Sequence, residues 1–244
     1  MKNITLLLYF LFSLNTFSQD NLCRTSIWNN AALFQKNELN KYTNNDFSVL
    51  WNKTENKYVY GVIGDNYQRI LIKFISIKRN DKNKNEYIVN GKSQVKSNIC
   101  DFAGTITITK IQELKKVKFG LDDEYKNSGI KSQGLLVANY KFVENKNQKN
   151  TGEFQGKLAT IFYVDKNGFI KYDDIEIHKD SYFNNAFVGT WKSNNSGKEK
   201  VCNWGDYRVP NTNCDFDIGA GELSISKKYI KNGWVDEPHQ KWWK

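Results

Sequence analysis

The chain has 244 residues, a length that suits one or two domains with a substantial core. Hydrophobic residues make up 39% and charged residues 25%, and there are only 2 prolines, which excludes a disordered, collagen-like or multi-span membrane protein. The net charge is +10, but 32 of the 36 basic residues are Lys, scattered along the chain. Recognition of base edges and bidentate phosphate contacts rely on clustered Arg, so we expect no nucleic-acid partner.

Residues 1–19 have the parts of a secretory signal peptide. Lys2 precedes an apolar run from Ile4 to Phe12, and the small-x-small triplet Thr16-Phe17-Ser18 suits cleavage after Ser18 or Gln19. The run is about half the roughly 20 residues needed to cross a membrane. We therefore expect an exported protein, periplasmic or extracellular, with no membrane span after the signal is removed.

The segment 20–57 contains one short pattern that predicts a helix. Asn30 precedes Ala31 to Phe34, and Leu39 and Tyr42 continue the helical spacing. From residue 58 onward the apolar period changes to two.

The clearest strand pattern is Phe102 to Thr109, in which Ile106 and Ile108 face one side and Thr residues face the other. Turn chemistry separates such segments, for example Asn167-Gly168, and no amphipathic helix of crossover length lies between them. The pattern therefore predicts an antiparallel up-and-down meander over residues 58–192. The other predicted strands are Ile70 to Ile77, Glu86 to Gly91, Leu135 to Val143, Phe154 to Val164, Phe169 to Ile177 and Phe187 to Trp191.

A pattern of Phe-x-Gly-x-large apolar occurs three times, starting at Phe102, Phe154 and Phe187. In a strand these three positions share one face, and a Gly between bulky residues suits a sheet that bends sharply or that packs a ring against backbone. We interpret the pattern as a mainly β protein whose meander closes into a barrel or a strongly coiled sheet.

The segment 193–244 is predicted to be a cystine-stapled extension that packs on the barrel and adds strands around Glu222 to Tyr229. In an oxidising compartment the four cysteines predict two disulfides, Cys202 with Cys214 and Cys23 with Cys100. Two other pairings, or four unpaired buried thiols, remain open.

The segments Cys202 to Asp206 and Asp217 to Glu222 resemble an uncharacterised exported family of Bacteroidota with Cys-Asn-Trp-Gly-Asp and Asp-Ile-Gly-Ala-Gly-Glu motifs. This resemblance extends back through Gly91-Lys92-Ser93 and Phe187 to Trp191, and it implies no activity. Gly189-Thr190-Trp191 also resembles the Gly-x-Trp of lipocalins, although in that family the motif opens the first strand, so no ligand chemistry is carried over.

The sequence lacks the catalytic motifs of most classes of enzyme. Only His178 and His239 are present, neither in a catalytic or metal-ligand spacing, and no Gly-x-Ser-x-Gly elbow occurs. Around Asp165 to Asp174, a comparison with calcium loops fails because strands flank the segment. No catalytic residue is therefore assigned.

The C-terminal segment carries the candidate sites. Aromatic and polar residues in irregular chain predict a ligand surface at Trp204, Asp206, Tyr207, Arg208 and Trp234, with Trp242 and Trp243 also expected to be exposed. Four acids form a candidate calcium site: Asp206, Asp215, Asp217 and Glu222. Otherwise we expect no cofactor.

The sequence favours a non-catalytic exported binding or interaction protein whose partner is a small molecule, a glycan or a protein. Two alternatives remain. One is a carbohydrate-active hydrolase that uses a pair of carboxylates, and the other is a periplasmic inhibitor or immunity-type protein.

Overall fold

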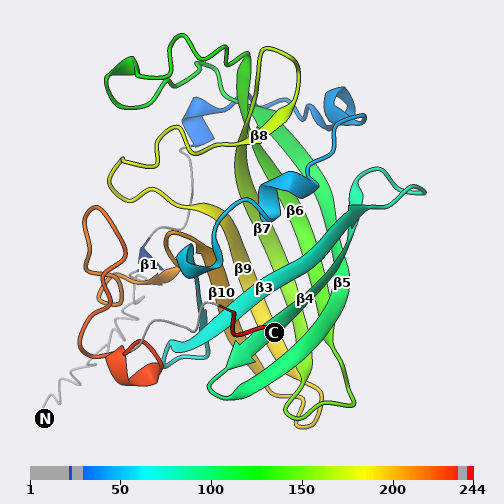
Figure 1. Ribbon diagram of the computed structural model, residues 1–244, viewed down its shortest axis with the longest axis vertical. Helices are drawn as coiled ribbons and strands as arrows, with labels where there is room; N and C mark the ends of the chain where they lie inside the picture. The colour runs from blue at the N-terminus through cyan, green and yellow to red at the C-terminus, as the bar shows by residue number, and fades with distance from the viewer. Residues whose placement is uncertain (1–21, 24–29, 236–240) are drawn as a thin grey trace, which may run out of the picture.

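The computed structural model describes residues 22–23, 30–235 and 241–244 (Figure 1). The predicted signal peptide lies outside these residues. Eight antiparallel strands form a closed barrel in chain order. Their bounds are β2 Val59–Ile63, β3 Gln68–Arg79, β4 Glu86–Val95, β5 Asn98–Glu113, β6 Ser132–Glu144, β7 Gly152–Val164, β9 Asn184–Ser193 and β10 Glu199–Asp206.

The last barrel strand closes the sheet onto the first. β10 pairs with β2 from Cys202 opposite Ile63 to Asp206 opposite Val59, and it pairs with β9 on its other side. The predicted meander is thus confirmed, but its boundary at residue 192 is wrong. Residues 199–206, expected in an extension, are the eighth strand of the barrel.

Short elements surround the barrel. β8 (Ile170–Tyr172) pairs with the end of β7, and β1 (Leu22–Cys23) pairs with β11 (Thr212–Asn213) in a separate two-stranded sheet. The predicted N-terminal helix is two 3-10 turns, η1 (Asn30–Ala32) and η2 (Leu39–Tyr42). The remaining 3-10 turns are η3 Ser48–Trp51, η4 Asn56–Tyr58, η5 Leu121–Asp123 and η6 Ile230–Asn232.

Two predicted strands are shorter or missing. The segment Phe169 to Ile177 forms only β8, and the segment Glu222 to Tyr229 forms a single bridge, Asp217 with Ile225. Both segments contain polar residues where a strand would need an apolar face.

Aromatic rings fill the middle of the barrel. Trp204 stacks on Phe187 at a centroid distance of 4.6 Å, and Phe142 stacks on Phe102 at 5.1 Å. Residues two apart share a face of a strand, and on these strands the inward face carries the apolar residues. Trp204 is therefore buried, contrary to the exposure expected from sequence, and so are Trp234 and Trp242. We call this inner group of rings, comprising Phe74, Phe102, Tyr140, Phe142, Phe154, Phe187 and Trp204, the aromatic plug.

One end of the barrel is covered by the N-terminal segment. Phe47, Leu50 and Trp51, in and next to η3, are buried. The Trp51 indole donates a hydrogen bond to Thr160 Oγ1 at 3.2 Å and packs edge-on against Tyr87. The opposite end, at the bottom of Figure 1, carries the turns β4–β5, β6–β7 and β9–β10.

The three Phe-x-Gly-x motifs lie on the inward face, as predicted. Gly156 and Gly189 face each other on β7 and β9, and a Cβ on Gly156 would lie 2.2 Å from the Val188 carbonyl oxygen. The Tyr140 hydroxyl occupies the adjacent space, 2.9 Å from that same Cβ position. The glycines therefore let two backbones and a ring approach closely where the sheet coils.

The close approach at Gly156 predicts the effect of adding one methyl group. Gly156→Ala should lower the free energy of unfolding by about 2 kcal/mol or more, since overpacking a dense interior costs about 1–3 kcal/mol. Gly221→Ala is the control, because the nearest atom to its added Cβ is 3.8 Å away. Urea unfolding measures both, and equal effects would contradict this packing.

The predicted disulfides are wrong where the structure tests them. Cys100 and Cys202 are free and buried, so the bridges Cys202–Cys214 and Cys23–Cys100 are both absent. Cys202 points into the barrel from β10, because it shares the inward face of that strand with Trp204. The sequence prediction paired Cys202 with Cys214 because they are close along the chain, and it did not take the inward orientation of Cys202 into account.

We predict that both thiols resist alkylation in the folded protein. Burial raises the pKa of the Cys100 and Cys202 thiols, which lowers their reactive thiolate fraction as well as their access to reagent. Mass mapping after iodoacetamide treatment should find both residues unmodified under native conditions and modified after unfolding in denaturant. Recovery of Cys202 in a disulfide would contradict the structure.

Candidate ligand-binding site

A cavity of about 760 Å³ opens at the end of the barrel opposite η3. Its rim includes the turns that join β2 to β3 and β4 to β5, and its walls are formed by side chains that point inward from the strands. Its volume lies within the usual range for small-molecule sites. The lining residues are Ile63, Gly64, Asp65, Asn66, Gln68, Ile70, Ser93, Val95, Lys96, Ser97, Asn98, Glu144, Asn150, Phe154, Trp191, Lys200 and Asn232.

The apolar part of the lining continues into the aromatic plug. Ile63, Ile70 and Val95 line the cavity together with Trp191 and Phe154. Phe154 also contacts Trp204 edge-on, with the ring centroids 6.0 Å apart. The cavity is therefore bounded on its inner side by packed rings.

One buried carboxyl faces this cavity. Glu144 is the last residue of β6 and only 4% exposed, and it points inward like Phe142 two residues before it. Its Oε2 accepts hydrogen bonds from Trp191 Nε1 at 2.9 Å and from the Gly152 backbone N–H at 2.7 Å. Its Oε1 accepts a short hydrogen bond from the Ser93 hydroxyl. Four strands, β4, β6, β7 and β9, thus fix the carboxyl in one orientation.

Burial dominates the electrostatics of Glu144. Desolvation raises the pKa of its carboxyl, and the three hydrogen bonds oppose that shift only in part. Among the described residues, none of the ion pairs includes Glu144. Lys200, the nearby cation on β10, instead lies over the Trp191 ring, 5.9 Å from its centroid.

A second buried carboxyl lies at the covered end. Asp206 Oδ2 accepts hydrogen bonds from Thr54 Oγ1 at 2.7 Å, Asn185 Nδ2 at 2.7 Å and the Tyr172 hydroxyl at 2.9 Å. It borders a void of about 30 Å³. Burial raises the pKa of Asp206 to about 7. We interpret these hydrogen bonds as a structural contact that holds β10 against the N-terminal segment, not as a ligand-binding site.

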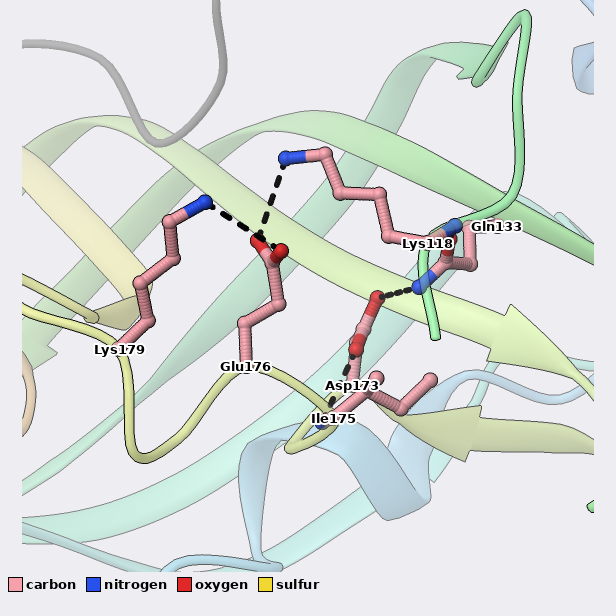
Figure 2. Close-up of polar contacts among 6 residues, drawn as sticks. All are labelled: Lys118, Gln133, Asp173, Ile175, Glu176 and Lys179. Carbon is pink, nitrogen blue, oxygen red and sulfur yellow. Dashed lines mark hydrogen bonds and ion pairs between the residues drawn. The ribbon is translucent and has the colours of Figure 1, made fainter. Parts of the chain in front are cut away.

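A third polar group holds the segment after β8 against β6 (Figure 2). Asp173 accepts hydrogen bonds from Gln133 Nε2 at 3.0 Å and from the Ile175 backbone N–H at 3.2 Å, and burial raises its pKa to about 7. Beside it, Glu176 binds the ammonium groups of Lys118 and Lys179. Asp173 thus ties the segment after β8 to β6, and Glu176 ties it to the segment that follows β5.

The structure does not bring the five predicted ligand residues together. Trp204 and Asp206 are inside the barrel. Arg208 is buried in an ion pair with Asp217, while Tyr207 stacks on Tyr58 at a centroid distance of 5.4 Å. Trp234 is buried and donates a hydrogen bond from its indole to the Tyr67 carbonyl at 3.0 Å.

The four acids of the candidate calcium site are also dispersed. Asp206 lies in the barrel interior, and Asp217 is paired with Arg208. Asp215 is exposed and paired with Lys228 at 2.8 Å, and Glu222 is exposed on the surface. In the part of the chain that the structure describes, no three His, Cys, Asp or Glu residues are grouped to hold a metal ion.

Sequence reasoning missed the residues that line the cavity. Glu144 carried a usable signal, because it continues the inward alternation of Tyr140 and Phe142 with an acid. Ser93 and Trp191 appeared only in the family resemblance and in a glycine motif. Their approach to Glu144 follows from barrel closure, which joins strands far apart in sequence.

Comparison with protein-family models, with curated proteins and with solved structures finds no match. None of the described helices is long and apolar enough to span a membrane. The described residues thus form a closed antiparallel barrel with a large cavity at one end.

The raised pKa of Asp206 predicts a pH-dependent stability. The folded state holds this proton up to about pH 7, whereas an unfolded Asp loses it near 3.9, so the contribution to stability falls as pH rises between those values. Between about pH 4.5 and about pH 7.5 this decrease is on the order of 3 kcal/mol. Asp206→Asn should remove it, because the amide does not titrate and its oxygen still accepts the three hydrogen bonds. Urea unfolding at about pH 4.5 and about pH 7.5 measures this. Asp215→Asn, an exposed control, should retain the decrease.

Proposed function

We propose that this protein is an exported, non-catalytic binding protein that holds a small molecule in the open end of its barrel. The observation that carries the proposal is the cavity of about 760 Å³, which is lined by barrel strands, partly apolar and bounded by the buried aromatic plug. Preformed pockets of this size with a few fixed polar groups are the usual form of small-molecule sites. Export rests on the sequence of residues 1–19.

The distribution of acids favours binding over glycoside hydrolysis. A glycosidase needs two carboxyls that face each other across the scissile bond. Among the described residues, only Asp65 and Glu144 contribute carboxyls to the cavity lining, and Asp65 is exposed in the turn between β2 and β3. Glu144 is instead held by three donors on the inner wall.

A substitution that fills the cavity tests the proposal. Val95→Trp should weaken binding of the neutral apolar fluorophore N-phenyl-1-naphthylamine by about tenfold or more, a loss of about 1.4 kcal/mol, because the larger ring occupies the apolar wall. Val201→Trp is the control, since Val201 is 47% exposed and does not line the cavity.

Fluorophore titration measures both variants against the unchanged protein. The proposal requires saturable binding that Val201→Trp retains and Val95→Trp loses. Absence of saturable binding to the unchanged protein, or equal affinity of both variants, would overturn it. Urea unfolding of each variant establishes that the barrel is intact.

A further inference from the structure

Glu144 is a buried acid whose hydrogen-bond partners are all neutral. Ser93, Trp191 and the Gly152 backbone donate to it, and they orient the carboxyl without supplying a positive charge. A buried charge that lacks an opposite charge is unfavourable. The wall of the cavity thus holds a carboxyl suited to a cation that comes from outside the protein.

The carboxyl also has acceptor capacity left over. Two carboxylate oxygens offer about four positions for hydrogen-bond donors. Two donors reach Oε2, but only the Ser93 hydroxyl reaches Oε1. Because Glu144 lines the cavity, a donor from a bound molecule would complete the set at Oε1.

The other charged groups of the lining leave this position to a ligand. Lys200 lies over the Trp191 ring, 5.9 Å from its centroid, and does not pair with Glu144. Lys96 is exposed in the β4–β5 turn, and Asp65 is exposed in the β2–β3 turn. The charges of these side chains with Glu144 sum to zero, two positive and two negative. The lining therefore does not repel a cation as a whole, while its innermost charge is negative.

We propose that the cavity binds amphiphilic amines, with the ammonium group on the Glu144 carboxylate and the apolar part against Ile63, Ile70 and Phe154. This inference rests on the proposed function, since it names the class of molecule that the same cavity takes. An ammonium supplies both the missing charge and a charge-assisted hydrogen bond to Oε1. An alcohol supplies only the hydrogen bond, and a carboxylate adds a like charge beside Glu144.

Three probes with one chain length separate these contributions: n-octylamine, 1-octanol and octanoate. Each is titrated against protein loaded with N-phenyl-1-naphthylamine, and displacement of the fluorophore gives its affinity. We expect octylamine to bind about tenfold or more tightly than octanol, and octanoate to bind most weakly.

Glu144→Gln is the diagnostic variant. Its amide oxygen still accepts from Trp191 and Gly152, and its NH2 group donates to the Ser93 hydroxyl, so the wall keeps its hydrogen bonds without the charge. Octylamine affinity should fall by about tenfold or more, with octanol affinity unchanged. Glu153→Gln, the same substitution at an acid that pairs with Lys141 and does not line the cavity, should change neither.

A pH titration of the unchanged protein gives a second measurement that needs no variant. Octylamine stays protonated between about pH 8 and about pH 5, whereas Glu144 has a pKa raised by burial, so protonation of Glu144 should weaken octylamine binding as pH falls. The Cys100 and Cys202 thiols interact electrostatically with Glu144, and burial raises the pKa of both, so they stay protonated over this range. The charged group of the cavity lining on β10 is Lys200, which lies over the Trp191 ring. Octanol affinity, the control, should stay constant.

The outcomes separate this inference from the proposed function. If the fluorophore does not bind saturably, the proposed function fails. If it binds but octylamine does not displace it, the amine inference is overturned while the proposed function stands. If all three bind with similar affinity, and Glu144→Gln and pH have no effect on octylamine, the cavity binds apolar molecules and the role of Glu144 is overturned. Preferential loss of octylamine binding in Glu144→Gln supports both.

Discussion

The pairing of β10 with β2 is the contact on which the rest of the structure depends. Five residues of each strand, Cys202 to Asp206 and Val59 to Ile63, join the two ends of the meander. Without this pairing the sheet would have two open edges with unpaired backbone groups, and no interior would be enclosed. Closure also places Cys202, Trp204 and Asp206 inside, which explains why a segment with a polar, glycine-containing sequence is so deeply buried.

The aromatic plug divides the barrel interior into two regions with different roles. On its covered side, Asp206 is fully occupied by Thr54, Tyr172 and Asn185, and only a small void remains. On its open side, Glu144 retains a free acceptor position next to a large cavity. Two buried acids in one barrel therefore differ in environment, because one is enclosed by protein groups and the other borders the open cavity.

Much of the architecture could be predicted from local patterns. Alternation in segments such as Phe102 to Thr109, together with turn residues such as Asn167-Gly168, specifies antiparallel hairpins, and the repeated glycine motif indicates coiling. β10 was missed because Lys198-Glu199-Lys200 and Gly205 weaken its strand pattern. Its strand conformation comes from the two neighbouring strands rather than from its own propensity.

The candidate site was less accessible to sequence reasoning for a physical reason. Ser93, Glu144 and Trp191 are about 50 residues apart along the chain and meet only after closure. Conversely, Trp204 to Arg208 are consecutive in sequence, but β10 ends at Asp206. Trp204 and Asp206 therefore face the barrel interior, whereas Tyr207 and Arg208 contact Tyr58 and Asp217 outside the strand. The predicted ligand residues are separated because adjacent strand residues face opposite sides of a sheet. The predicted Cys202–Cys214 pair fails because Cys202 faces the barrel interior.

The separation between the rim turns and the aromatic plug has a consequence for how such a protein can diversify. Residues 64–66 and 96–97 border the cavity from connecting turns and contribute no ring to the plug. Exchange of these short loops would alter the entrance while the strand pairs and inner rings that stabilise the barrel stay the same. Under the proposed binding function, selection on the ligand can thus proceed largely independently of selection on folding.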